Sequence, residues 1–299
     1  MKIDVVDGFK MLSDITRKPT LIVESDRLND CMRYAVEKKI TRIYLQNNYG
    51  FNLSNVDFLK DFNFFTEISI IKDYSEIDVS GVQFLKQLVH LTLSNGNQGL
   101  DFGSFPYLED ASVDWNNKLN NLHLCKRLNK LVLWLYKPKS GSFQELKNLS
   151  SVKSLKITQS NVNSLSGLEG LNQLEEFEAY YLTKLENFAP VDVISQTLRS
   201  LTLENCKKLH DYEGALGSLT NLQKLILSRC GNLNDLQFVN HLKKLSFFSF
   251  VGTNITDGDL SLLLKAKIEY VGFDDKRHYS HKMKEVNAKF SSNLNSDAG

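Results

Sequence analysis

Cysteine and histidine are among the residues of this chain that could bind a metal ion or act as nucleophiles. The four cysteines are Cys31, Cys125, Cys206 and Cys230. No two of them have the Cys-x-x-Cys spacing of a zinc site or a redox centre. Only His278 and His281 are close together among the histidines, and we interpret them as part of a solvated basic end. We therefore expect no metal and no cofactor, and we expect the thiols to be buried and reduced.

Motifs of known catalytic chemistry do not occur in the sequence. It contains no Gly-x-Ser-x-Gly turn for a nucleophilic serine and no His-Glu-x-x-His zinc helix. The glycine pairs Gly167/Gly170 and Gly214/Gly217 lack the third glycine and the basic partner of a phosphate-binding loop. The sequence therefore predicts a protein that is not an enzyme.

Charge and hydrophobicity argue against several kinds of partner. The 299 residues include 36 Lys and Arg against 35 Asp and Glu, so a net charge of +1 gives no overall attraction to nucleic acid. No apolar run is long enough to span a membrane, so we expect no membrane span. Residues Met1 to Thr20 lack the basic start and apolar core of a signal peptide, which predicts a cytoplasmic protein.

One pattern, L-x-x-L-x-L-x-x-N/C, recurs along most of the chain. Its copies are 20 to 25 residues apart, within the spacing of about 20–29 residues that is typical of such repeats. In the x-L-x-L-x core, period-two alternation directs the two apolar side chains inward and the x side chains outward. The copies begin at Ile40, Phe65, Leu88, Leu108, Leu128, Val152, Leu174, Leu198, Leu222, Leu245 and Ile268.

The ninth position of each repeat lies where the chain turns away from the strand. A small polar side chain there can hydrogen-bond to backbone groups that the turn removes from the sheet. Cys206 and Cys230 occupy this position, so we interpret them as structural residues. The other small polar residues at this position are Asn48, Asp73, Asn116, Ser160 and Thr253. Irregular turns are expected at Gly96, Tyr136, Leu182 and Lys276.

The pattern resembles the leucine-rich-repeat superfamily over residues 40–275. Val152–Gln173 is similar to the internalin-type repeat of about 22 residues, and Leu198–Leu209 (LRSLTLENCKKL) to the cysteine-containing subclass. Because the two types are mixed, we assign no subfamily. The resemblance implies an α/β repeat solenoid of about eleven repeats, a curved horseshoe with a parallel β-sheet on its concave face. It also implies a general role in protein binding.

Both ends of such a solenoid need caps, because an open end exposes the core. Residues 1–39 are expected to form an N-terminal strand–helix cap, with a strand at Leu21–Val23 and a helix capped by Ser25 or Asp26. The buried face of that helix is expected to carry Leu28, Cys31, Met32, Ala35 and Val36. Residues 276–299 are expected to form a C-terminal helical cap and a flexible tail from Ser291 onward. The apolar face of this second helix would carry Tyr279, Met283, Val286 and Phe290.

Positions three, five, seven and eight of each repeat are expected to project from the concave face. Both tryptophans, Trp115 and Trp134, fall at these positions in consecutive repeats, and Tyr180 and Tyr181 do so in the seventh repeat. Trp and Tyr are frequent among the residues that dominate binding energy at interfaces. The predicted protein-binding residues are Asp114, Trp115, Trp134, Lys156, Glu178, Tyr180, Tyr181 and Glu204.

Two interpretations of the tryptophans stay open. They could contact a partner, or they could fold over the repeat edge and shield the short repeats around them. One of Tyr180 and Tyr181 is expected to pack inward. The acids near the aromatic residues are Asp110, Asp114, Glu176, Glu178 and Glu204, against the bases Lys130 and Lys156. This surplus of acids favours a basic protein partner and argues against nucleic acid.

The sequence therefore predicts a non-catalytic protein-binding protein. Within that class, the acidic and aromatic surface favours an inhibitor or immunity protein that neutralises a basic enzyme or toxin through the concave face. The alternative is an adaptor or regulatory subunit that recruits an enzyme to a protein substrate. An adaptor would need a separate docking segment, and only the two ends of the chain could supply one.

Overall fold

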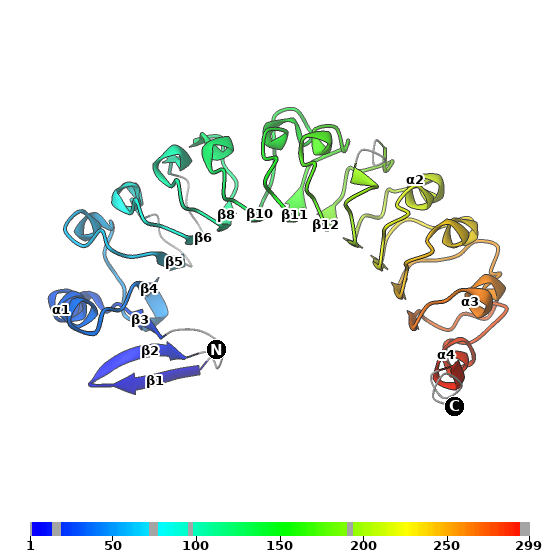
Figure 1. The fold of residues 1–299 in the computed structure, drawn as a ribbon, viewed down its shortest axis with the longest axis horizontal. Helices are drawn as coiled ribbons and strands as arrows, with labels where there is room; N and C mark the ends of the chain where they lie inside the picture. Colours follow the sequence, from blue (N-terminus) through cyan, green and yellow to red (C-terminus); the bar gives the residue numbers. More distant parts are fainter. Residues whose placement is uncertain (1, 14–18, 72–76, 95–97, 190–193, 294–299) are drawn as a thin grey trace. The chain divides into compact units, whose positions relative to one another are not determined.

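The computed structural model describes residues 2–13, 19–71, 77–94, 98–189 and 194–293. The chain divides into two compact units, Met1–Trp134 and Leu135–Gly299. In each unit a row of strands forms one side and short helices form the other (Figure 1). This is the predicted α/β repeat solenoid with a parallel sheet. No helix among the described residues is long and apolar enough to cross a membrane.

The sheet of the first unit is parallel from its third strand onward. Ile68 lies beside Leu91 and Leu91 beside Ala111 in the register of neighbouring strands. All three side chains are buried, as period-two alternation requires. Strands β7 (Leu100–Asp101) and β9 (Leu119–Asn120) form a small separate sheet. The main strands, in spatial order, are β1 (Lys2–Val6), β2 (Phe9–Ser13), β3 (Thr20–Ile22), β4 (Arg42–Gln46), β5 (Glu67–Ile71), β6 (His90–Ser94), β8 (Asp110–Asp114) and β10 (Lys130–Trp134).

The first two strands form a hairpin that the sequence analysis did not predict. They pair antiparallel with only Asp7 and Gly8 between them. Both turn residues have positive φ angles, 51° and 81°, as a type I′ turn requires. The Asp-Gly pair between Val6 and Phe9 is a strong hairpin signal in a sequence. β2 pairs antiparallel with β3, so the hairpin extends the sheet at its N-terminal end.

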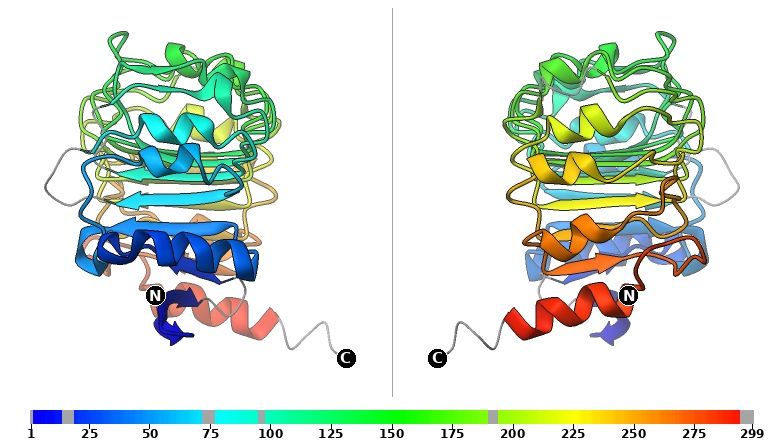
Figure 2. Two further views of the ribbon diagram at one scale, coloured as in Figure 1. Left: turned by 90° about the vertical axis from the view of Figure 1, so that its left-hand side faces the viewer. Right: turned by 90° about the vertical axis from the view of Figure 1, so that its right-hand side faces the viewer.

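The first helix, α1 (Leu28–Lys38), lies on the helical side of the first unit (Figures 1 and 2). The predicted N-cap is wrong, because a 3-10 helix, η1 (Ser25–Arg27), precedes α1 and the N-cap residue Arg27 makes no side-chain cap hydrogen bond. The predicted buried face is confirmed at Cys31, Met32 and Ala35 but is wrong at Val36. Val36 is 54% exposed, whereas Tyr34 is buried. The cause is the hairpin, since the ring of Phe9 stacks on that of Tyr34 at 4.1 Å.

The second unit contains a purely parallel sheet. Phe177 lies beside Leu201 and Leu201 beside Leu225, and each of these side chains is fully buried. The right-hand view of Figure 2 shows the helices of this unit in front of its strands. The strands, in spatial order, are β11 (Ser154–Ser160), β12 (Glu176–Leu182), β13 (Ser200–Glu204), β14 (Lys224–Ser228), β15 (Phe247–Ser249) and β16 (Tyr270–Gly272).

Short helices connect the strands on the opposite side. The α-helices of the second unit are α2 (Glu213–Gly217), α3 (Ser261–Lys265) and α4 (Met283–Asn293). The remaining 3-10 helices are η2 (Asn47–Tyr49), η3 (Asp57–Lys60), η4 (Ser80–Phe84), η5 (Phe102–Ser104), η6 (Leu122–Leu124), η7 (Gln144–Leu146), η8 (Leu168–Gly170) and η10 (Gln237–His241). A one-turn helix is enough here because each connection only has to span the width of one repeat.

Helix α4 covers the last strand of the second unit. The side-chain amide of Asn287 accepts the Val271 N–H at 3.0 Å and donates to the Val271 carbonyl at 2.8 Å. These two bonds satisfy backbone groups at the free edge of β16. Because α4 continues to Asn293, the loose tail predicted from Ser291 begins too early. Tyr279 is buried but precedes the helix, and the side chain of Phe290 lies outside the described residues.

The ninth-position residues join neighbouring repeats, as predicted. The Thr253 hydroxyl donates to the Leu227 carbonyl at 2.7 Å and accepts the Cys230 N–H at 2.9 Å. Similar bonds to backbone groups are made by Asn116, Ser160 and Cys230. Asp73 and Gly96, at the same position, lie outside the described residues.

Candidate functional site

The predicted binding residues fall into two groups, one in each unit. Asp114, Trp115 and Trp134 lie in the first unit. The remaining five, Lys156, Glu178, Tyr180, Tyr181 and Glu204, lie in the second unit on β11, β12 and β13. In register, Lys156 is beside Glu178, and Tyr180 is beside Glu204. The parallel sheet therefore brings residues 22 and 24 positions apart side by side on one face.

Lys156, Glu178 and Tyr180 form a closed set of contacts on the strand face. The Lys156 ammonium is 3.4 Å from Glu178 Oε2 and 4.6 Å from the centroid of the Tyr180 ring. The Tyr180 hydroxyl donates to the same Glu178 oxygen at 3.0 Å. The ring is thus held beneath a cation and tethered at its hydroxyl. Neither Tyr180 nor Tyr181 is buried, so the expectation that one packs inward is wrong.

Tyr180 titrates at unusually high pH. Partial burial, followed by the nearby carboxylates of Glu178 and Glu204, raises its pKa to about 12. Both effects disfavour a negative phenolate. The hydroxyl therefore stays neutral at physiological pH and acts as a fixed hydrogen-bond donor.

Arg229 completes this surface, and the sequence analysis did not include it. Its guanidinium forms an ion pair with Glu204 and donates to Asn205 Oδ1 at 3.3 Å. Arg229 occupies position eight of the ninth repeat. The acids and bases compared in the sequence analysis lie in earlier repeats. Glu204 is therefore compensated, and the strand face carries alternating charges. We name Lys156, Glu178, Tyr180, Glu204 and Arg229 the cross-strand cluster.

A column of left-handed residues runs beside the cross-strand cluster. Six successive repeats place a residue with positive φ at position eight. These are Leu135 (55°), Gln159 (56°), Tyr181 (59°), Asn205 (56°), Arg229 (50°) and Gly252 (75°). Only the last is glycine, although an L-residue in this conformation costs roughly 1–2 kcal/mol. We name these residues the left-handed column.

Large apolar side chains are exposed within the left-handed column. Tyr181 is 46% exposed and Leu135 is 42% exposed. Each residue therefore combines an unfavourable backbone conformation with a side chain whose partial burial contributes little to the stability of the fold. Backbone strain of this kind is concentrated at binding and catalytic sites.

The two tryptophans lie at the ends of adjacent strands in the first unit. The Trp115 N–H donates to the Trp134 carbonyl at 2.8 Å, and Asp114 is beside Trp134 in register. Trp134 is 44% exposed, whereas Trp115 is half-buried. Trp134 thus presents most of the exposed aromatic surface of this group.

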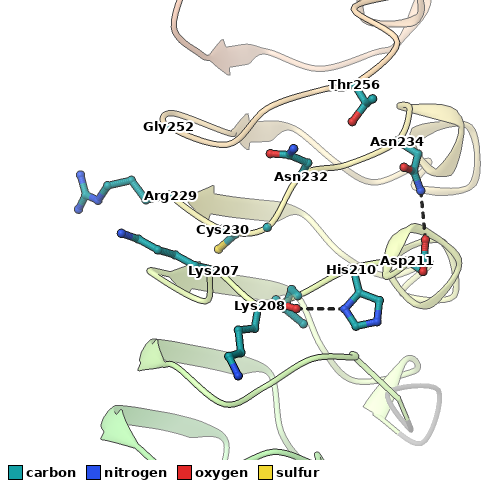
Figure 3. Close-up of a pocket in the computed structure, with 12 residues that line it drawn as sticks. Lys207, Lys208, His210, Asp211, Arg229, Cys230, Asn232, Asn234, Gly252 and Thr256 are labelled. Carbon is teal, nitrogen blue, oxygen red and sulfur yellow. Dashed lines mark hydrogen bonds between the residues drawn. The ribbon is translucent and has the colours of Figure 1, made fainter.

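A shallow hollow of about 670 Å³ opens among the turns of the second unit (Figure 3). Lys207, Lys208, His210 and Arg229 make its lining basic. Figure 3 shows Lys207 and Arg229 extending to one side and Lys208 to another, so the cations do not converge. Lys208 is also 3.6 Å from Glu186. Small-molecule sites require convergent polar groups, and we assign no ligand to this hollow.

The pKa values of the buried cysteine thiols shift in both directions. A hydrogen bond with Cys230 lowers the pKa of Cys206, whereas burial raises that of Cys31. All four are buried and free. Burial raises the pKa of Cys125 to about 12, and a hydrogen bond with Cys206 together with burial raises that of Cys230. Thiols with raised pKa values are poor nucleophiles. Among the described residues, no group of three or more His, Cys, Asp or Glu side chains could hold a metal ion.

Comparison with known proteins is informative for the fold. An internalin of Listeria monocytogenes, InlF, is similar over 75% of this chain and 70% of its own, with a TM-score of 0.52 and 19% identity. InlJ from the same species, whose functional domain includes a cysteine ladder, matches 73% of this chain and 46% of its own, with a TM-score of 0.50 and 21% identity. The leucine-rich-repeat domain of the type III effector XopL matches 75% and 83%, with a TM-score of 0.50 and 18% identity. No protein-family model matches the chain, and no curated protein matches its sequence.

Proposed function

The chain has the leucine-rich-repeat fold, and from that premise we propose that it is a non-catalytic protein that binds another protein through the strand face of its second unit. The binding residues in this proposal are the cross-strand cluster together with Tyr181. Trp134, with Asp114 and Trp115 beside it, is proposed as a second contact region on the first unit.

The observation that carries the proposal is the exposed Tyr181 in a strained backbone conformation. Folding alone gives no reason for a tyrosine at φ 59°, because glycine has the same conformation without the steric cost. A binding partner does give a reason, since it would bury an aromatic ring that folding leaves 46% exposed. Rigid aromatic residues contribute strongly to binding because they lose little conformational entropy.

The cross-strand cluster adds chemical selectivity to this surface. Glu178 and Glu204 each carry a negative charge that is balanced by one exposed cation, Lys156 or Arg229. A basic side chain of a partner could displace Lys156 or Arg229 and form an ion pair with the released carboxylate of Glu178 or Glu204. We therefore propose a basic protein partner, and specifically a role as inhibitor or immunity protein for a basic enzyme or toxin. An adaptor that recruits an enzyme would use the same face for one of its two partners.

The proposal places the protein in the cytoplasm. Four buried free thiols, two of them in hydrogen-bonding contact, fit a reducing compartment. No catalytic step is assigned to any residue. Binding is proposed as the whole activity.

The test compares the wild-type chain with Glu178→Lys in affinity capture of partners from cells of the source organism. Like charge beside Lys156 should weaken capture of a stoichiometric partner by about tenfold or more. Glu186→Lys is the matched control, because it reverses an exposed carboxylate of the same repeat that lies outside the strand face. Circular dichroism confirms that each variant is folded. Equal capture by both variants would contradict the proposal.

A further inference from the structure

The edge strand β1 is the most exposed apolar segment of the first unit. Ile3 is 36% exposed, Val5 69% and Val6 47%. Among the described residues, β1 pairs with β2 on one edge and with no strand on the other (Figure 1). The last strand of the second unit differs, because Asn287 bonds to the free edge of β16. An unprotected edge strand is a template for pairing with another chain.

The hairpin register shows which backbone groups face outward. In a hairpin with a two-residue turn, the residues flanking the turn form a hydrogen-bonded pair, and such pairs then alternate. Val6 and Phe9 flank the turn here, so Asp4 and Met11 form the next hydrogen-bonded pair. Ile3 and Val5 fall between them and direct their N–H and C=O groups away from β2. The free edge therefore offers donors and acceptors at the two residues whose apolar side chains are also exposed.

The charges of β1 identify the strand that it fits. Lys2 and Asp4 lie on the same side of the strand, since Lys2 Nζ is 2.9 Å from Asp4 Oδ1. If a second copy of β1 pairs antiparallel with Ile3 opposite Ile3, each Lys2 faces an Asp4 of the other copy. Two other two-fold registers fit the charges less well: Asp4 opposite Asp4 puts like charges in the closest cross-strand position, and Val5 opposite Val5 puts Lys2 opposite Gly8 and forms no ion pair. The sequence of the strand is thus complementary to itself in one register.

We propose that β1 is a self-association surface, through which two copies of this chain join their sheets by antiparallel pairing about Ile3. The pairing adds backbone hydrogen bonds at Ile3, two Lys2–Asp4 ion pairs between copies, and apolar contact along Ile3 and Val5. The strand is five residues long, so the dimer forms with low affinity and depends on concentration. This surface is separate from the one proposed for the protein partner.

The charge register gives a test that separates contacts between copies from contacts within one. Lys2→Asp and Asp4→Lys each place like charges opposite one another, and each variant should self-associate about tenfold more weakly than wild type. An equimolar mixture of the two restores opposite charges at both positions, so heterodimers should form with near wild-type affinity. Analytical ultracentrifugation over a concentration series measures all three samples, using the full chain with no residue added before Met1.

A second variant tests the backbone of the edge. Ile3→Pro removes the N–H at the centre of the proposed pairing, which points away from β2, and leaves the hydrogen bonds of the hairpin intact. It should abolish dimerisation while the melting temperature stays near that of wild type. A wild-type chain that remains monomeric at about 0.5 mM would overturn the proposal. So would a dimer that persists in Ile3→Pro, or a mixture of the two charge variants that associates no better than either alone.

Discussion

The Tyr180 hydroxyl donates a hydrogen bond to Glu178 Oε2 at 3.0 Å, while Lys156 covers the ring of the same tyrosine. Both residues lie on one strand, two positions apart, so the contact is local. Its setting is not local, because Lys156 and Glu204 approach from the two neighbouring strands. The parallel sheet thus brings side chains from three repeats together in one cluster.

This arrangement predicts a pH dependence at the alkaline end. The folded-state pKa of Tyr180 is about 12, above its ordinary value of 10.0. The folded protein therefore holds this proton more tightly than the unfolded chain, and the stabilisation is complete below pH 10 and lost as the pH rises toward 12. Tyr180→Phe should lose less stability than wild type over this window. Urea denaturation at a series of pH values measures the difference, and identical pH profiles would contradict the assignment.

Glu178→Gln tests the electrostatic part of the same effect. Removing the carboxylate charge should lower the pKa of Tyr180, although burial, the larger cause, keeps it above its ordinary value. Ultraviolet difference titration of phenolate absorbance, with Tyr180→Phe as the reference, follows this one tyrosine. An unchanged titration would show that Glu178 does not act on the phenol.

The left-handed column predicts that one substitution will separate stability from binding. Tyr181→Gly relieves the strain at φ 59° and should raise the free energy of unfolding by about 0.5–1 kcal/mol. The same change removes the aromatic ring and should weaken partner capture. Gly252→Ala makes the opposite change and should destabilise the fold. The new Cβ would lie 2.6 Å from Arg229 Cγ, and the residue would have to keep a φ of 75°. Chemical denaturation measures both variants, and a less stable Tyr181→Gly would contradict the strain argument.

Thr253 allows a test of how much a ninth-position side chain contributes to the free energy of unfolding. Its side chain is almost fully buried, and its hydroxyl bonds to backbone groups of two positions in the preceding repeat. Thr253→Val keeps the shape but leaves the Cys230 N–H and the Leu227 carbonyl without this partner, which should cost about 1–3 kcal/mol. Thr183→Val, at an exposed position, is the control and should change the unfolding free energy by less than about 0.5 kcal/mol. Similar losses in both variants would show that the hydroxyl bonds contribute little.

The repeats could be predicted because each one repeats the same physical requirement. Each strand of this kind must bury two apolar side chains, as β13 buries Leu201 and Leu203. A ninth-position side chain such as Cys230 or Thr253 must bond to the backbone where the strand ends. Such requirements depend on spacing along the chain, which a sequence displays directly. The contacts between Lys156 and Glu178, and between Tyr180 and its neighbours, follow from the same register once the strands are aligned.

Features that depend on local turns could not be predicted in the same way. The positive φ at Leu135, Gln159 and Tyr181 arises from the shape of the turn, and none of these residue types favours it. Arg229 was missed because it lies in the ninth repeat, one repeat beyond the acids and bases that the sequence analysis compared, although the register brings it to Glu204, 25 residues earlier. The hairpin of β1 and β2 had a readable signal in Asp7-Gly8. Its docking against Tyr34 adds that residue to the buried face of α1, where the sequence predicted Val36 instead.

Site-specific photo-crosslinking at Tyr181 tests the central claim most directly. A photoreactive phenylalanine analogue replaces Tyr181 in one protein and Tyr107 in another, since Tyr107 is 39% exposed and lies outside the strands of the first unit. Both are irradiated in extract from the source cells and compared by mass. The account predicts one discrete crosslinked partner at position 181, lost when Glu178→Lys is added, and none at position 107. The same crosslinked species from both positions, or a crosslink at 181 that is unaffected by Glu178→Lys, would contradict it.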